Sequence, residues 1–76
     1  MEGTIKTAAF SIRKELSDGN HEGAIGLQVE LKGAFVAEMS TQAGSYSQGA
    51  IQSMAKSIMD LDNEIFKGEA VEEATA

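Results

Sequence analysis

The sequence predicts an α+β fold, in which an antiparallel β-hairpin is followed by one long amphipathic α-helix and copies of the chain form a homo-oligomer. Three observations predict this fold. An Asp-Gly pair at 18–19 lies between two segments that can alternate apolar and polar residues, which is a strong hairpin signal. The segment after the pair alternates clearly, and the second half of the chain repeats its apolar residues at helical spacing.

The segment before the turn, 5–16, fits both a strand and a helix. A strand places these apolar residues on one face: Ala8, Phe10, Ile12 and Leu16. A helix instead forms a stripe from Ile5, Ala8, Ala9, Ile12 and Leu16. The helix leaves Phe10 among polar residues, and the turn that follows needs a strand as its partner, so we expect a strand.

After the turn, apolar residues occupy every second position of the predicted second strand: Ile25, Leu27, Val29 and Leu31. The register of the hairpin has two solutions. If residues 18 and 19 form the loop, Ile12 faces Ile25 across the strands. If residues 19 and 20 form the loop, the register shifts, but the same side chains stay on the same face. Both solutions bury one apolar face.

Residues 47–67 are predicted to form the long helix. An S-x-x-Q capping box at 45–48 marks its start. Large apolar residues then recur three and four positions apart, as in a coiled-coil seam: Ile51, Met54, Ile58, Leu61 and Ile65. A hairpin and one helix bury each other only in part. This seam is therefore expected to pack on the sheet and also to form the oligomer interface with a second copy.

Composition limits the class of protein. Twelve acidic and six basic side chains give a net charge of −6, which argues against direct nucleic-acid binding. We expect one domain over 1–68, followed by an acidic flexible tail over 69–76. The chain has no cysteine, and we expect neither a membrane-spanning segment nor a signal peptide. The expected location is the cytoplasm.

Catalysis is not expected from this set of residues. His21 is the only histidine, so a hydroxyl nucleophile has a single candidate base and a transition metal lacks its usual ligands. An exposed position in the turn is the simplest explanation of His21. Neither G-x-G-x-x-G nor a phosphate-binding G-x-x-x-x-G-K-[ST] motif occurs. The sequence therefore predicts a protein that is not an enzyme and that uses no cofactor and no metal.

One segment, 41–49, has the character of a binding site. It is polar, contains glycine and leads into a helix N-terminus, where free N–H groups hold phosphate or carboxylate groups. A basic pair on the first predicted strand of a neighbouring copy would supply positive charge. The ligand-binding residues are therefore predicted to be Arg13, Lys14, Ser45, Tyr46, Ser47 and Gln48. An ordinary capped loop is the alternative explanation.

The stretch 10–21, FSIRKELSDGNH, resembles a pattern in small uncharacterised bacteriophage proteins. In that pattern a strand with a basic pair leads into a Ser-Asp-Gly-Asn-aromatic turn, an alternating strand and a helix; His21 stands where tyrosine is expected. The resemblance implies a phage accessory protein of the anti-defence type, acting in the host cell. It would sequester a small anionic signalling nucleotide or a host defence protein. The alternative is a structural, recombination or replication accessory protein of a phage.

Overall fold

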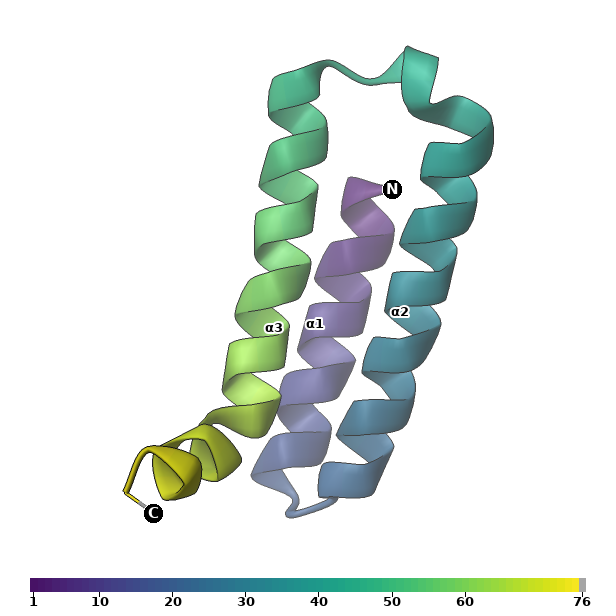
Figure 1. Ribbon diagram of the computed structural model, residues 1–76. Coiled ribbons are helices and arrows are strands. Elements are labelled where there is room, and N and C mark those ends of the chain that lie inside the picture. The colour runs from purple at the N-terminus through teal and green to yellow at the C-terminus, as the bar shows by residue number, and fades with distance from the viewer. Residues whose placement is uncertain (76) are drawn as a thin grey trace.

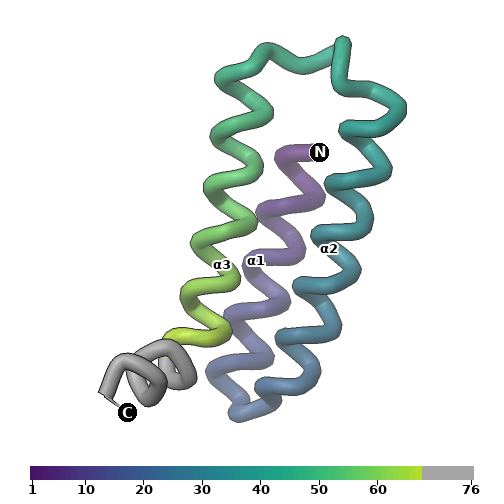
Figure 2. Tube along the Cα trace, viewed as in Figure 1, coloured from purple at the N-terminus to yellow at the C-terminus, as the bar shows by residue number. Residues whose placement is uncertain are grey.

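Three α-helices, each antiparallel to the one before it, make up the protein in the computed structural model (Figure 1). They are α1 (Glu2–Ser17), α2 (His21–Gln42) and α3 (Gln48–Thr75), and a short 3-10 turn, η1 (Ala43–Ser45), precedes α3. Figure 2 follows the chain along α1, back along α2 and into α3. The structure describes the backbone through residue 75 and side chains through residue 67, so the predicted tail over 69–76 lies outside the fully described residues.

The predicted β-hairpin is wrong, and with it the α+β class, because residues 1–75 contain helices and no strand. The segment 5–16, which fitted both alternatives, lies in α1 and buries Ile5 and Ile12. The predicted second strand lies in α2, which packs against α1 on one side and α3 on the other. A helix with two neighbours needs a wide apolar arc. Residues two positions apart, such as Ile25 and Leu27, therefore both contact the core, which imitates the alternation of a strand.

The Asp-Gly pair does form a tight turn, but this turn joins two helices. Gly19 has a φ of +80°, which glycine adopts without a steric cost. The N–H of Gly19 donates to the carbonyl of Leu16 at 3.1 Å, and that of Asn20 donates to Glu15 at 2.8 Å. These two bonds make a Schellman cap at the end of α1. The Asn20 side chain then accepts a bond from the N–H of Gly23 at 3.1 Å and caps the start of α2.

Replacing Gly19 by valine is expected to destabilise the bundle by about 1–3 kcal/mol, because a β-branched residue is strained at a positive φ. The matched variant Gly19→Asn should lose less, since asparagine tolerates the left-handed region. Thermal unfolding followed by circular dichroism measures both variants. A valine variant that melts at the wild-type temperature would show that this turn has another conformation.

The core lies where the three helices meet, and the seam of α3 supplies half of it. The buried apolar residues are Ile5, Ile12, Ala24, Leu31, Met54, Ile58, Leu61 and Ile65. The remaining member of the predicted seam, Ile51, is partly buried and packs against them. The seam that the sequence predicts as an oligomer interface therefore faces α1 and α2 of the same chain, where it stabilises the single bundle.

Candidate functional site

The residues predicted to bind an anion lie at two separate places in the chain. Ser45, Tyr46 and Ser47 precede α3, whereas Arg13 forms an ion pair with Glu64. Glu64 lies sixteen residues along α3 from its first residue, or about 24 Å at 1.5 Å per residue. A single copy therefore does not bring Arg13 to the loop.

Side chains of the loop before α3 bond to the protein itself. The Tyr46 hydroxyl donates to a carboxylate oxygen of Glu38 at 2.5 Å, and this bond raises the pKa of Tyr46. Ser47 Oγ accepts from the N–H of Ala50 at 3.1 Å. The helix cap is thus Ser47 and not Ser45, which lies in η1. The carboxylate of Glu38 puts negative charge beside the aromatic ring that was predicted to meet an anion.

On α1, the basic pair splits into one bound and one exposed side chain. The guanidinium of Arg13 donates two hydrogen bonds to the carboxylate of Glu64, from Nε to Oε1 at 3.0 Å and from Nη2 to Oε2 at 2.9 Å. The hydrogen bond and the charge of Glu64 raise the pKa of Arg13, and the bond from Arg13 lowers the pKa of Glu64. Lys14 is exposed and makes no ion pair with residues 1–67.

Replacing Arg13 by alanine is expected to cost no more than about 1 kcal/mol, because the ion pair is largely exposed. The folded pKa of Glu64 lies below its unfolded value. The contribution of the ion pair to the free energy of unfolding is therefore present above the unfolded pKa of Glu64 and disappears as the pH falls through its folded pKa. Urea unfolding at neutral pH and near pH 2 measures this difference. Lys14→Ala is the control and should match the wild type at both values; an Arg13→Ala deficit that persists in acid would assign the effect to packing.

A different surface stands out on α2 and α3, where two stripes of side chains run next to each other. Within each stripe the spacing is four, three and four residues, so each stripe occupies one face of its helix. We name this surface the α2–α3 face. It consists of Ile25, Val29, Lys32 and Val36 from α2, and Ala55, Met59, Asp62 and Phe66 from α3.

Three large apolar side chains of the α2–α3 face are mostly exposed. The exposed fractions are 64% for Val29, 62% for Val36 and 63% for Met59. Single exposed apolar residues are ordinary, as with Phe10 on α1, but a group of them on one surface is a candidate interaction site. In the chain, each of these three side chains follows a residue that is buried or packed against the core, namely Gln28, Phe35 and Ile58, so the face adjoins the core directly.

Polar bonds hold the two stripes together at their centre. Lys32 Nζ lies 2.8 Å from a carboxylate oxygen of Asp62. Gln28, only 2% exposed, donates through Nε2 to the carbonyl of Ile58 at 2.9 Å and to Asp62 at 3.0 Å. Burial raises the pKa of Asp62, but the bonds from Lys32 and Gln28 outweigh it, and the net pKa is lowered. Asp62 is thus ionised at neutral pH, and its bonds to Lys32 and Gln28 fix α3 against α2.

At one end of the face, next to Phe66, His21 joins α2 to α3. Its Nε2 donates to the carbonyl of Ile65 at 2.5 Å, and its ring meets Phe66 edge to face, with 6.1 Å between ring centres. His21 is half-buried, so the predicted exposed position in the turn is wrong. The reason is that the turn joins helices, and the first residue of α2 lies against α3.

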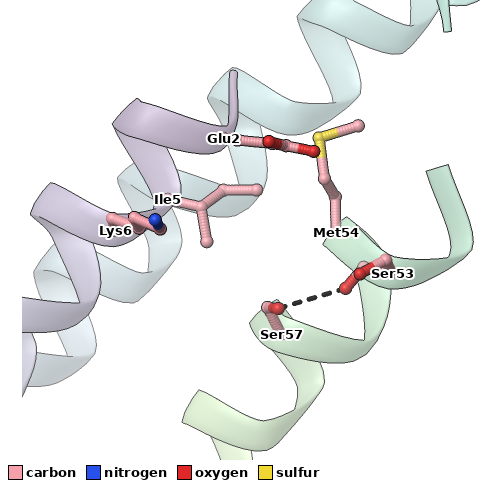
Figure 3. A pocket seen from close by; sticks show the side chains of 6 residues that line it. All are labelled: Glu2, Ile5, Lys6, Ser53, Met54 and Ser57. Carbon is pink, nitrogen blue, oxygen red and sulfur yellow. Dashed lines mark hydrogen bonds between the residues drawn. The ribbon is translucent and has the colours of Figure 1, made fainter. Parts of the chain in front are cut away.

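Three open grooves run beside α1. The first, about 250 Å³, lies between α1 and α3 (Figure 3), and its lining residues are Glu2, Ile5, Lys6, Ser53, Met54 and Ser57. The second, about 490 Å³, is lined by Gly3, Thr4, Thr7, Ala8, Ser11 and Leu27. The first is smaller than most small-molecule sites of about 300–1,000 Å³, and the second has no charged side chain to match an anion. The third, about 190 Å³, includes Lys6, Arg13 and Asp60 in its lining and is smaller still. None of these three grooves has the features of a nucleotide site.

No protein-family model, curated protein or solved structure matches the chain. None of its helices, over the residues described, is long and apolar enough to cross a membrane. Within residues 1–67, the most distinctive feature of the surface of the bundle is the α2–α3 face.

Proposed function

We propose that this chain is a non-enzymatic protein that acts by binding another protein, and that the α2–α3 face is the surface it uses. One observation carries the proposal: Val29, Val36 and Met59 expose more than three fifths of their surface on a single side of two adjacent helices. Covering such side chains releases about 25 cal/mol per Å² of apolar area, so a protein partner gains free energy from every one of them.

The same geometry favours a protein over a nucleotide as the ligand. Arg13, the predicted phosphate-binding residue, is engaged by both oxygens of Glu64, and Tyr46 bonds to Glu38. A nucleotide would have to displace a carboxylate from each of these two side chains before it contacted them. The phage accessory role remains a prediction from the sequence, and within it the present proposal selects a protein partner over a signalling nucleotide.

Photo-crosslinking in the source cell tests the proposal. A photo-reactive amino acid replaces Met59 in one variant and Phe10 in a second, because both positions are exposed to a similar degree, 63% and 73%. The Met59 variant should yield a discrete covalent adduct with another polypeptide on illumination. The Phe10 variant, on α1, should not yield that adduct.

Two outcomes would overturn the proposal. One is a Met59 variant that yields no polypeptide adduct. The other is an identical adduct pattern from both positions, which would indicate nonspecific contact. Calorimetry against cyclic and linear nucleotides tests the alternative ligand, and binding heat that Arg13→Ala removes would favour the nucleotide.

A further inference from the structure

We infer that the α2–α3 face binds a second copy of the same chain, giving a two-fold homodimer. This inference rests on the proposed function and names the partner of that face. Its first support is electrostatic. The chain carries a net charge of −6, so two copies repel each other across most of their surface. The two charged side chains of the face, Lys32 and Asp62, neutralise each other at 2.8 Å, so this is a place where two copies can approach without net repulsion.

The second support is the symmetry of the face. It consists of two antiparallel helices (Figure 1), and each contributes a stripe with the same four-three-four spacing. A two-fold axis in the plane of the face, either along or across the helices, places each helix antiparallel to the one opposite it. In both arrangements the two helices of one copy pack on the two helices of the other, as in antiparallel four-helix bundles. Both copies use the same patch.

The size of the face indicates how strongly the two copies would bind. From Ile25 to Val36 the stripe on α2 is about 17 Å long, and two neighbouring helices are about 20 Å across. A footprint of roughly 340 Å² is less than half of the about 800 Å² per partner in a stable complex. The dimer is therefore in reversible equilibrium with the monomer, which is already folded through its own core.

The central ion pair determines the register of this dimer. In the monomer the side chain of Lys32 is 49% exposed and that of Asp62 is 30% exposed, so both are partly solvated. In the dimer they lie among apolar side chains, where a charge without a partner is costly. Sliding one copy along the other would place apolar residues over this pair. The arrangement that lets the two pairs meet is thus favoured.

Sedimentation velocity over a concentration series from micromolar to millimolar tests the inference. The wild-type chain should shift from monomer to dimer as concentration rises. Val29→Glu and Met59→Glu should raise the dissociation constant at least tenfold. Phe10→Glu is the matched control, since it adds the same charge at an exposed apolar residue of α1, and it should dimerise like the wild type. Circular dichroism should show all three variants to be folded, because these side chains lie outside the core.

The outcomes separate this inference from the proposed function. A wild-type chain that stays monomeric throughout the series overturns the dimer, and so does a Phe10→Glu variant that weakens association as much as Met59→Glu. If the Met59 crosslink in cells nevertheless joins a different polypeptide, the proposed function stands without the dimer. An adduct with twice the mass of the chain supports both.

Discussion

Replacing Leu61 by alanine is expected to destabilise the protein by about 2–5 kcal/mol. Leu61 is 1% exposed and is one of the two largest fully buried side chains. A single core of this size supplies only about 3–5 kcal/mol in total, so the variant should lose most of the free energy of unfolding. Urea unfolding followed by far-ultraviolet circular dichroism measures the loss.

Met59→Ala provides the control for this result. It lies two residues away on the same helix but is 63% exposed, so the change in free energy should stay within about 0.5 kcal/mol at concentrations that keep the chain monomeric. Equal losses at the two positions would contradict the assignment of Leu61 to the core.

The second large effect is expected from Gln28→Glu, which keeps the shape of the side chain and removes its donor. Nε2 of Gln28 donates to two acceptors, the carbonyl of Ile58 and the carboxylate of Asp62. An ionised carboxylate in its place meets only oxygen atoms in a site that is 2% exposed. Uncompensated buried charges cost about 3–5 kcal/mol, so the variant should be mostly unfolded at neutral pH.

The loss in Gln28→Glu should recover in acid. Burial and the neighbouring Asp62 raise the pKa of the introduced carboxyl in the folded state above its unfolded value. Its deficit relative to the wild type is therefore absent below the unfolded pKa and grows as the pH rises through the folded pKa. Gln52→Glu, an exposed site on α3, is the control and should show little change. A Gln28→Glu variant as stable as the control at neutral pH would contradict the buried bonds of Gln28.

Sequence patterns predict α3 and the position of the first turn, but not the fold class. The three-four spacing from Ile51 to Ile65 predicts one long helix because no strand accommodates it, and the Asp-Gly pair predicts a turn with a positive φ. Both features are present in the structure. The same pair serves a β-hairpin and a Schellman cap equally well, since both need glycine at a positive φ. Whether the turn joins strands or helices depends on the elements against which each segment packs. A local sequence pattern does not contain that information.

The α2–α3 face was missed for a related reason. As a strand, the segment around Val29 places that residue inside the hairpin core, whereas in α2 it is exposed. A signal was present: Ile25, Val29, Lys32 and Val36 repeat at spacings of four, three and four, as do the residues of the matching stripe on α3. On each helix this stripe lies beside the residues that face the core. A helix with a second apolar stripe of this kind has room for more neighbours than one short chain supplies. The ion pair between Lys32 and Asp62 needed the structure, because it joins residues thirty positions apart.

The turn between α1 and α2 also has a kinetic consequence. It brings together two helices that are separated by only three residues, so the loop that must close during folding is very short. Helical proteins with such local contacts fold in roughly microseconds to milliseconds. The chain contains no proline, so no slow cis–trans isomerisation of an X-Pro bond delays any molecule. We therefore expect the α1–α2 hairpin to form early and the docking of α3 onto it to set the folding rate.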